Sequence, residues 1–154
     1  MSVQVSIERG RHHDIGRTMP VMRAAFDAEF GEAWTAAQCA SALAMPGAWL
    51  HLAMNDGAVV GFALARSVLD ETELLLLAVD ASFRRYGIGR LLTEAVLSEA
   101  RAEGGRSLFV EVRANNPARQ FYDRLGFIQT GYRKNYYRGV SGLYNDAVTL
   151  TCQL

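Results

Sequence analysis

Apolar residues follow two different spacings in the first part of the chain, and each spacing predicts one kind of element. Residues 3–7, VQVSI, alternate apolar and polar side chains, which predicts a short strand. Residues 12–30 carry apolar residues at helical spacing, which predicts a helix that bends near Pro20. The apolar positions of this helix are Ile15, Met19, Met22, Phe26 and Phe30.

A second helix and a hairpin are expected next. Residues 34–45 form the helix, with Thr35 as its N-cap, and a Pro-Gly pair follows its end. Residues 48–54 and 58–69 are two strand-like runs joined by the turn NDG. Asn or Asp before Gly supplies the positive φ angles that a tight hairpin turn needs.

The second half of the chain predicts a central strand, a long helix and a closing sheet. Residues 72–79, TELLLLAV, are too continuously apolar for a one-sided strand and predict one buried on both faces. The helix after them stops at EGG and has an apolar stripe of Ile88, Leu91, Leu92, Ala95, Val96 and Ala100. A strand at 107–112, a short helix at 117–125 and strands at 127–137 and 146–154 follow. Together these elements predict an α/β fold, one mixed sheet with helices on its faces.

Composition narrows the class of protein. The chain has 154 residues, half of them apolar, which suits one domain spanning 1–154. Its 16 acidic and 16 basic residues cancel, so no overall field indicates a nucleic acid or a membrane as partner. The longest apolar run, LLLLAV, is too short to span a bilayer, and we expect a soluble, cytoplasmic protein.

The thiol and imidazole groups give no sign of a metal site. Cys39 and Cys152 are far apart in apolar surroundings, which favours two buried thiols over a disulfide or a metal pair. His12, His13 and His51 show no ligand spacing and are expected to be ordinary surface or half-buried residues.

The stretch FRRYGIGRLL, 83–92, predicts an anion site at the start of a helix. The first amides of a helix have no partner and carry a partial positive charge. Gly87 and Gly89 let a phosphate approach these amides, and nearby arginines supply charge. A tight strand-to-helix turn would explain the glycines without a ligand. A dinucleotide fingerprint is excluded because Leu92 stands where its third glycine would be, and no Gly-Lys-Ser/Thr sequence indicates a Walker loop.

Several stretches together resemble the GNAT superfamily of N-acetyltransferases, and within it the bacterial ribosomal-protein-alanine N-acetyltransferases. These stretches are DETELLLLAV, FRRYGIGRLL, VEVRANN, FYDRLGF, RKNYY, DAVTL and FGEAWT. The resemblance covers nearly the whole chain. It implies a central mixed sheet of six to seven strands with about four flanking helices, and acetyl-CoA as co-substrate without a metal.

The resemblance also assigns the acetyl-CoA site. In such folds the strand ending LLAV separates from the next strand, so that its free edge can bind the pantetheine arm as an added strand would. The alternative is a plain buried strand with a solvated arginine face. The residues expected to bind acetyl-CoA are Leu77, Ala78, Val79, Arg84, Arg85, Tyr86, Gly87, Ile88, Gly89, Arg90 and Asn116.

Two residues match the family's catalytic groups. Glu111 stands where these enzymes place a general base, and Tyr122 where a tyrosine protonates the departing thiolate. The alternatives are a carboxylate paired with Arg113 or Arg119, and a tyrosine that only packs. Asn116 has a second expected role, as a cap before Pro117. One residue fewer separates Glu111 from Tyr122 than is usual, so Asn115 could take its place at the cofactor.

The acceptor region departs from the family. FGEAW replaces a shorter proline-containing element, Arg138 stands where proline is common, and Asn145-Asp146 replaces Glu-Asp. Trp34, Tyr132, Tyr136 and Tyr137 could line the acceptor channel, with Asp146 or Glu32 attracting the amine. Packing in the core or at the sheet edge is the alternative for each of them. The expected acceptor is a protein α-amino group, as in a ribosomal protein. A small amine or a lysine is the alternative, and a non-catalytic coenzyme A sensor is the alternative of another class.

Overall fold

A seven-stranded sheet forms the centre of the protein. The computed structural model describes residues 3–154. The strands are β1 (Ser6–Gly10), β2 (Ala48–Asn55), β3 (Ala58–Val68), β4 (Glu71–Val79), β5 (Ser107–Arg113), β6 (Ile128–Arg138) and β7 (Tyr144–Gln153). They lie in the order β1-β2-β3-β4-β5-β7-β6, and all neighbours are antiparallel except β4 and β5. The predicted mixed sheet is confirmed.

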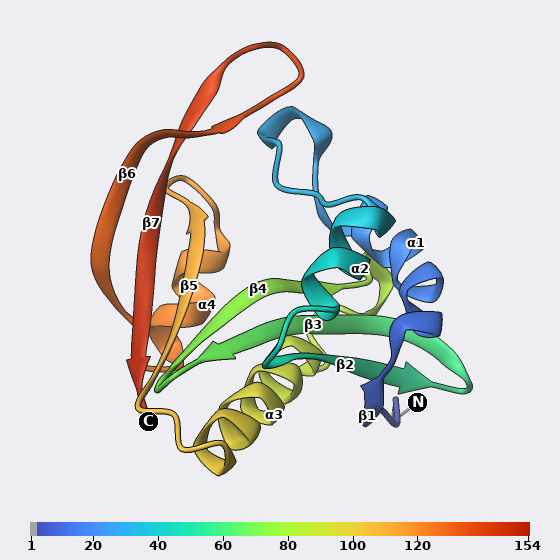
Figure 1. The fold of residues 1–154 in the computed structure, drawn as a ribbon. Helices are drawn as coiled ribbons and strands as arrows, with labels where there is room; N and C mark the ends of the chain where they lie inside the picture. The colour runs from blue at the N-terminus through green and yellow to red at the C-terminus, as the bar shows by residue number, and fades with distance from the viewer. Residues whose placement is uncertain (1–2) are drawn as a thin grey trace.

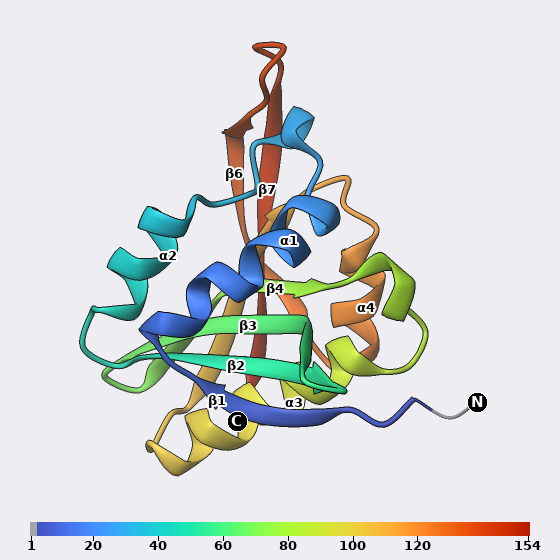
Figure 2. The same ribbon diagram turned by 90° about the vertical axis from the view of Figure 1, so that its right-hand side faces the viewer.

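Helices cover both faces of the sheet. The α-helices are α1 (Ile15–Ala25), α2 (Ala36–Leu43), α3 (Ile88–Ala102) and α4 (Ala118–Arg124), and the 3-10 helices are η1 (His12–Asp14), η2 (Ala28–Phe30) and η3 (Ala81–Phe83). Figure 2 shows α1 and α2 above the first four strands and α3 below them. The sheet therefore separates two apolar cores, one under α1 and one between the sheet, α3 and α4.

Some predicted boundaries are wrong. The first strand starts at Ser6, three residues later than the alternation indicated. Helix α1 ends at Ala25, since Phe26 is extended with φ −114° and ψ 123°. Phe26 and Phe30 therefore do not continue the helical stripe, although Pro20 does lie inside α1.

Other local predictions are confirmed by hydrogen bonds and dihedral angles. The Thr35 hydroxyl accepts from the amide of Gln38 at 3.1 Å, and the Gln38 side chain accepts from the amide of Thr35 at 2.8 Å. This reciprocal pair fixes the start of α2. In the turn between β2 and β3, Asp56 and Gly57 have φ angles of 48° and 77°, as a two-residue hairpin requires.

Strand β4 changes its facing in the middle. Leu64 pairs with Leu76, but the next residue of β3, Ala65, pairs with Leu74, so Leu75 is the extra residue of a β-bulge. Leu74 therefore joins the core under α3, whereas Leu75 and Leu76 join the core under α1. The strand is central as predicted, but burial on both faces is incomplete because alternate residues are only half-buried.

The sheet divides at the same place. Strands β4 and β5 pair only from Glu71–Ser107 to Leu74–Val110. Beyond that point Figure 1 shows β4 (light green) diverging from β5, β6 and β7 (orange to red). A separate observation concerns membranes: within residues 3–154, no helix is long and apolar enough to cross one. The location in the cytoplasm stays a prediction.

Adjacent leucines of α3 give a direct test of this packing. Leu92 is fully buried, but Leu91, which the sequence placed on the same stripe, is 41% exposed. Leu92→Ala should lower the free energy of unfolding by about 3 kcal/mol, because it removes buried methyl groups and leaves a cavity. Leu91→Ala is the matched control and should change it by less than about 0.5 kcal/mol. Urea denaturation of both variants measures the difference, and equal losses would contradict the placement of α3.

Candidate active site

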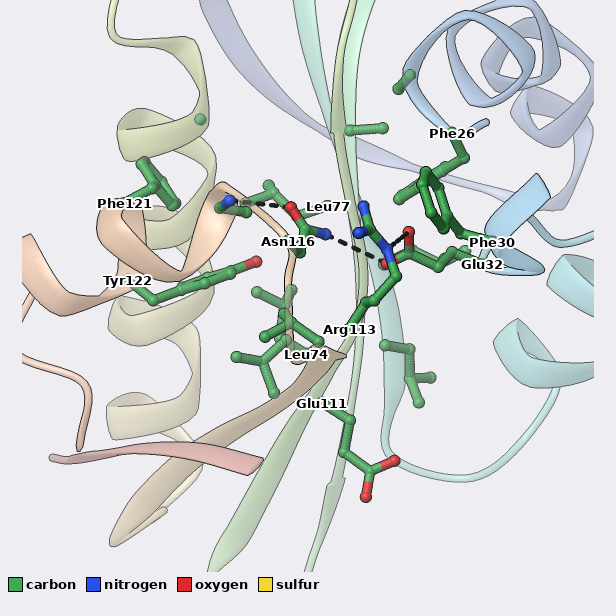
Figure 3. A pocket seen from close by; sticks show the side chains of 18 of the residues that line it. Phe26, Phe30, Glu32, Leu74, Leu77, Glu111, Arg113, Asn116, Phe121 and Tyr122 are labelled. Atoms are coloured by element: carbon green, nitrogen blue, oxygen red, sulfur yellow. Dashed lines mark hydrogen bonds and ion pairs between the residues drawn. The ribbon is translucent and has the colours of Figure 1, made fainter. Parts of the chain in front are cut away.

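A pocket of about 650 Å³ opens where β4 and β5 separate. Its walls come from the α1–α2 segment, β4, β5, the start of α3, α4 and the end of β6. Figure 3 shows Phe121 and Tyr122 on one side of the strands and Phe26, Phe30 and Glu32 on the other. The pocket thus connects the two faces of the sheet through the gap.

The free edge of β4 forms one wall. Leu77, Ala78 and Val79 line the pocket, and none of them pairs with β5. The expected separation of the two strands is therefore present. An unpaired strand edge offers backbone N–H and C=O groups to an extended ligand.

The loop between β4 and α3 presents unbonded amides. Among residues 3–154, no group accepts a hydrogen bond from the amides of residues 85–90, and the first helical bond joins Leu91 N to Gly87 O at 3.0 Å. Arg85 and Gly87 have φ angles of 72° and 75°, a conformation that Gly87 adopts without strain. Successive free amides at the start of a fifteen-residue helix offer donors of the kind that anions accept from.

The predicted loop residues do not all reach the pocket with their side chains. Arg84 and Gly89 line it, while Arg85, Tyr86 and Gly87 are exposed beside it. The side chain of Ile88 is 2% exposed and belongs to the core, so only its backbone is available. Arg90 Nε donates to Glu94 Oε1 at 2.8 Å.

Tyr122 places a hydroxyl in the pocket wall. The residue is 4% exposed, its ring packs against Phe121 and Phe127 at centroid distances of 5.1 and 5.2 Å, and its oxygen faces the pocket in Figure 3. Burial raises the pKa of Tyr122 because the phenolate would be poorly solvated there. The phenol is therefore in its neutral, proton-donating form at physiological pH.

Asn116 lines the pocket and Asn115 does not, which separates the two candidates for the contact with acetyl-CoA. Asn116 lines the pocket, its Oδ1 accepts from the amide of Ala118 at 2.9 Å, and its Nδ2 donates to Glu32 Oε2 at 3.2 Å. The side chain of Asn116 thus satisfies the first amide of α4, but the predicted boundary is wrong by one residue, because the helix begins at Ala118 and its N-cap is Pro117. Asn115 is not among the lining residues, and its Oδ1 accepts from Arg113 Nη1 at 2.7 Å. The position of Asn116 agrees better with the predicted contact to acetyl-CoA.

Glu111 lines the pocket from β5. Its side chain is 14% exposed, and Oε1 lies 3.0 Å from Arg133 Nε. The predicted alternatives, pairing with Arg113 or Arg119, are wrong because Arg113 binds Glu32 and Arg119 binds Ala114 and Gln129. Arg133 was missed because it lies two strands away in the sheet order.

The acceptor residues proposed from the sequence separate into two groups. Trp34, Glu32, Tyr136 and Tyr137 line the pocket, and the Tyr137 hydroxyl donates to the carbonyl of Glu111 at 3.2 Å. Burial, together with the charge of Glu32, raises the pKa of Tyr137.

Tyr132 and Asp146 are outside the pocket, so the predictions for them are wrong. Their side chains bind each other, and Asp146 also accepts from the amide of Asn135 at 2.8 Å. Tyr132 and Tyr136 would share a face of a regular strand. Because the pairing of β6 with β7 is irregular between Arg133 and Tyr137, Tyr136 faces the pocket and Tyr132 does not.

A buried ion pair links the two sides of the gap. Arg113 Nε lies 3.2 Å from Glu32 Oε1, both side chains are about one-tenth exposed, and the guanidinium stacks on Phe30 at 3.5 Å. Sequence analysis missed Arg113 and Phe30 as pocket residues, along with Phe26 and Glu73. The alternation of β5 could have indicated Arg113, since it shares a face with Glu111.

The tip of the β6–β7 hairpin contacts the segment that contains η2. Gly139 packs so closely on the carbonyl of Glu29 that a Cβ there would overlap it, and Ser141 donates to the Glu29 carboxylate. Gly31, with a φ of 67°, makes a similar approach to the carbonyl of Arg138. Figure 1 shows this hairpin beside the segment between α1 and α2.

Both cysteines are free, as predicted. Cys39 is buried, but the predicted burial of Cys152 is wrong because that residue is half-buried. His12 and His13 are exposed, as predicted. The prediction for His51 is wrong, since this residue is buried, with its Nε2 3.2 Å from Glu99 Oε2. The described residues contain no group of three or more histidine, cysteine or acidic side chains suited to a metal ion.

Comparison with known proteins identifies the family. A model described as "Acetyltransferase (GNAT) domain" matches residues 15–142. The ribosomal protein bS18-alanine N-acetyltransferase of Haemophilus influenzae is 35% identical over 101 residues, 66% of this chain and 69% of that protein. The ribosomal protein bS18-alanine N-acetyltransferase of Salmonella typhimurium is 40% identical over 104 residues, 66% of this chain and 70% of that protein.

Solved structures agree with this assignment. The ribosomal-protein-S18-alanine N-acetyltransferase from Escherichia coli superposes with a TM-score of 0.85 and 29% identity, over 97% of this chain and 94% of that chain. The chain therefore belongs to the GNAT acetyltransferase family and is an N-acetyltransferase. Members of this family use acetyl-CoA as the acetyl donor.

The buried ion pair provides a test of how the gap is held. Arg113→Met should lower the free energy of unfolding by about 3 kcal/mol, because it leaves the Glu32 carboxylate buried without its counterion. Adding Glu32→Gln should recover most of this loss, since a neutral amide has a far smaller desolvation cost. Urea denaturation of the single and double variants measures both effects. A double variant as unstable as Arg113→Met would contradict this explanation.

Proposed function

We propose that residues 1–154 act as one acetyltransferase domain that transfers the acetyl group of acetyl-CoA to the N-terminal α-amino group of a protein, with a ribosomal protein as the first candidate. The observation that carries this proposal is a pocket through the β4–β5 gap with Tyr122 on one side and Glu111 on the other. The names and similarity of the bacterial relatives support the choice of acceptor.

The residues present suit acetyl-CoA as the donor. The free amides of residues 85–90, with Arg84, Arg85 and Arg90 close by, suit its pyrophosphate, and Asn116 lies in the adjoining wall. The unpaired edge formed by residues 77–79 suits the pantetheine arm, which carries amides that can pair as a strand does. This arrangement directs the thioester toward the gap.

Glu111 and Tyr122 divide the proton transfers between them. Acetyl-CoA supplies the acetyl group as a thioester. Glu111 takes a proton from the acceptor ammonium, directly or through a water, and passes it to solvent. Tyr122 gives its phenolic proton to the sulfur as the C–S bond breaks and the C–N bond forms. The nitrogen then loses a second proton, one proton restores the phenol, and a single proton is released overall.

The carboxylate base suits an α-amine better than a lysine. An α-amino group has a pKa of about 8, compared with about 10.4 for lysine, so much less free energy is needed to deprotonate it at neutral pH. The departures of the α1–α2 segment and of Asn145-Asp146 from the family pattern favour a small amine or a lysine as the second candidate. A coenzyme A sensor would not require Glu111 and Tyr122 to line the same pocket.

One assay separates these functions. Purified protein and acetyl-CoA are offered a peptide copying a ribosomal-protein N-terminus, the same peptide blocked at its α-amine but retaining lysine, and a panel of small amines. We expect acetylation and thiol release with the free peptide only, measured by mass spectrometry and a thiol reagent. Turnover of the blocked peptide or of small amines would contradict the α-amine acceptor. Tight binding of coenzyme A by calorimetry without any turnover would favour the sensor.

The role of Glu111 predicts a specific pH profile. Glu111→Gln should lower kcat/KM about 100-fold near pH 7, and the loss should shrink above about pH 8, where the α-amine is increasingly neutral without a base. Initial rates between pH 6 and pH 10, chosen to bracket that value, measure the profile. Glu103→Gln, an exposed change at the end of α3, is the control and should follow the native profile. A constant loss at every pH would remove Glu111 as the base.

A further inference from the structure

The acceptor side of the pocket carries a second carboxylate next to Glu111. Glu73 on β4 is opposite Phe109 in the parallel ladder, and Glu111 follows two residues later on the same face of β5. Both carboxylates line the pocket. Burial raises the pKa of Glu73, and the nearby charge of Glu111 raises it further. Two adjacent carboxylates in a pocket create a strong local preference for a cation.

Arg133 is the cation that interacts with both Glu73 and Glu111 in this structure. Arg133 Nε lies 3.0 Å from Glu111 Oε1, and the charge of Arg133 also acts on Glu73. The arginine comes from β6 and crosses β7, where the residue opposite Arg133 is the small, buried Ala147. Its side chain is 60% exposed, whereas that of Glu111 is 14% exposed. A long surface side chain therefore covers a mostly buried carboxylate.

The other arginines near Glu73 and Glu111 are bound elsewhere and do not neutralise the two carboxylates. Arg66 on β3 also acts on Glu73, but its Nε donates to the carbonyl of Pro46 at 3.2 Å. Arg113, on the same face of β5, is paired with Glu32. Glu73 and Glu111 thus line the pocket with Arg133 as the counterion of Glu111, and its guanidinium also lies 5.2 Å from the centre of the Tyr136 ring. Only the arginine of this ion pair is largely exposed, so its guanidinium can leave the carboxylate for solvent at little desolvation cost.

We propose that Glu73 binds the acceptor as its ammonium cation, and that Arg133 fills the position of that cation in the free enzyme and moves aside when the acceptor enters. This inference rests on the proposed function and deepens it. Glu73 holds the cation, and Glu111, released from Arg133, takes the proton. We expect the site to favour acceptor peptides whose N-terminal residues carry positive charge. An acidic residue at the second position of the acceptor peptide should weaken its binding.

The test separates binding from turnover. Glu73→Gln should raise KM for the free-amine peptide at least about tenfold, the loss of a charge-assisted contact, while kcat changes less than about twofold. Glu73→Asp should keep part of the affinity. Arg133→Gln should lower KM, since it removes the internal competitor. Glu71→Gln, an exposed glutamate at the start of the same strand, is the matched control.

A binding measurement keeps the inference independent of catalysis. Calorimetry on protein saturated with coenzyme A compares the free-amine peptide with its N-formyl form, which lacks the cation. We expect the native protein to prefer the free amine and Glu73→Gln to lose this preference. Equal binding of the two peptides by the native protein, or an unchanged KM in Glu73→Gln, would overturn the inference. Preferential binding without acetylation would reject the proposed function but keep the role of Glu73.

Discussion

The early end of the β4–β5 ladder is the constraint on which the rest of the site depends. Pairing stops at Leu74 and Val110, and the bulge at Leu75 lies at the same point. Together they leave a usable edge on β4 and a passage between the two faces of the sheet, which is lined by side chains from both cores.

Sequence periodicity predicted what depends on short-range geometry. Thr35 at the start of α2 and the Asn-Asp-Gly turn were identified because their hydrogen bonds and φ angles are set by neighbours in the chain. Leu91 was misplaced because a stripe read from helical spacing is wider than the face that the sheet covers. Phe26 was misplaced because an apolar residue just beyond a helix continues its spacing without continuing its hydrogen bonds.

In the site too, features set by local sequence were predicted, and features set by pairing between distant strands were not. The glycine loop and the pair Glu111 and Tyr122 were found through local patterns and a family resemblance. Arg84 and Gly89 of that loop line the same cavity as Glu111 and Tyr122. Tyr132 could not be separated from Tyr136 because their facing depends on irregular pairing between β6 and β7. The contact of Arg133 with Glu111 joins residues that share neither a strand nor an adjacent strand, so strand alternation carries no signal for it.

The packing of Gly139 on Glu29 has a consequence for how acceptor preference can change. These residues belong to segments far apart in the sequence, yet neither backbone can shift without displacing the other. The hairpin tip and the α1–α2 segment, each of which continues into residues that line the pocket, are thus packed directly against each other. Lengthening or shortening one loop would demand a compensating change in the other, so grafting the hairpin of a relative onto this chain should succeed only when its matching helical segment is transplanted with it.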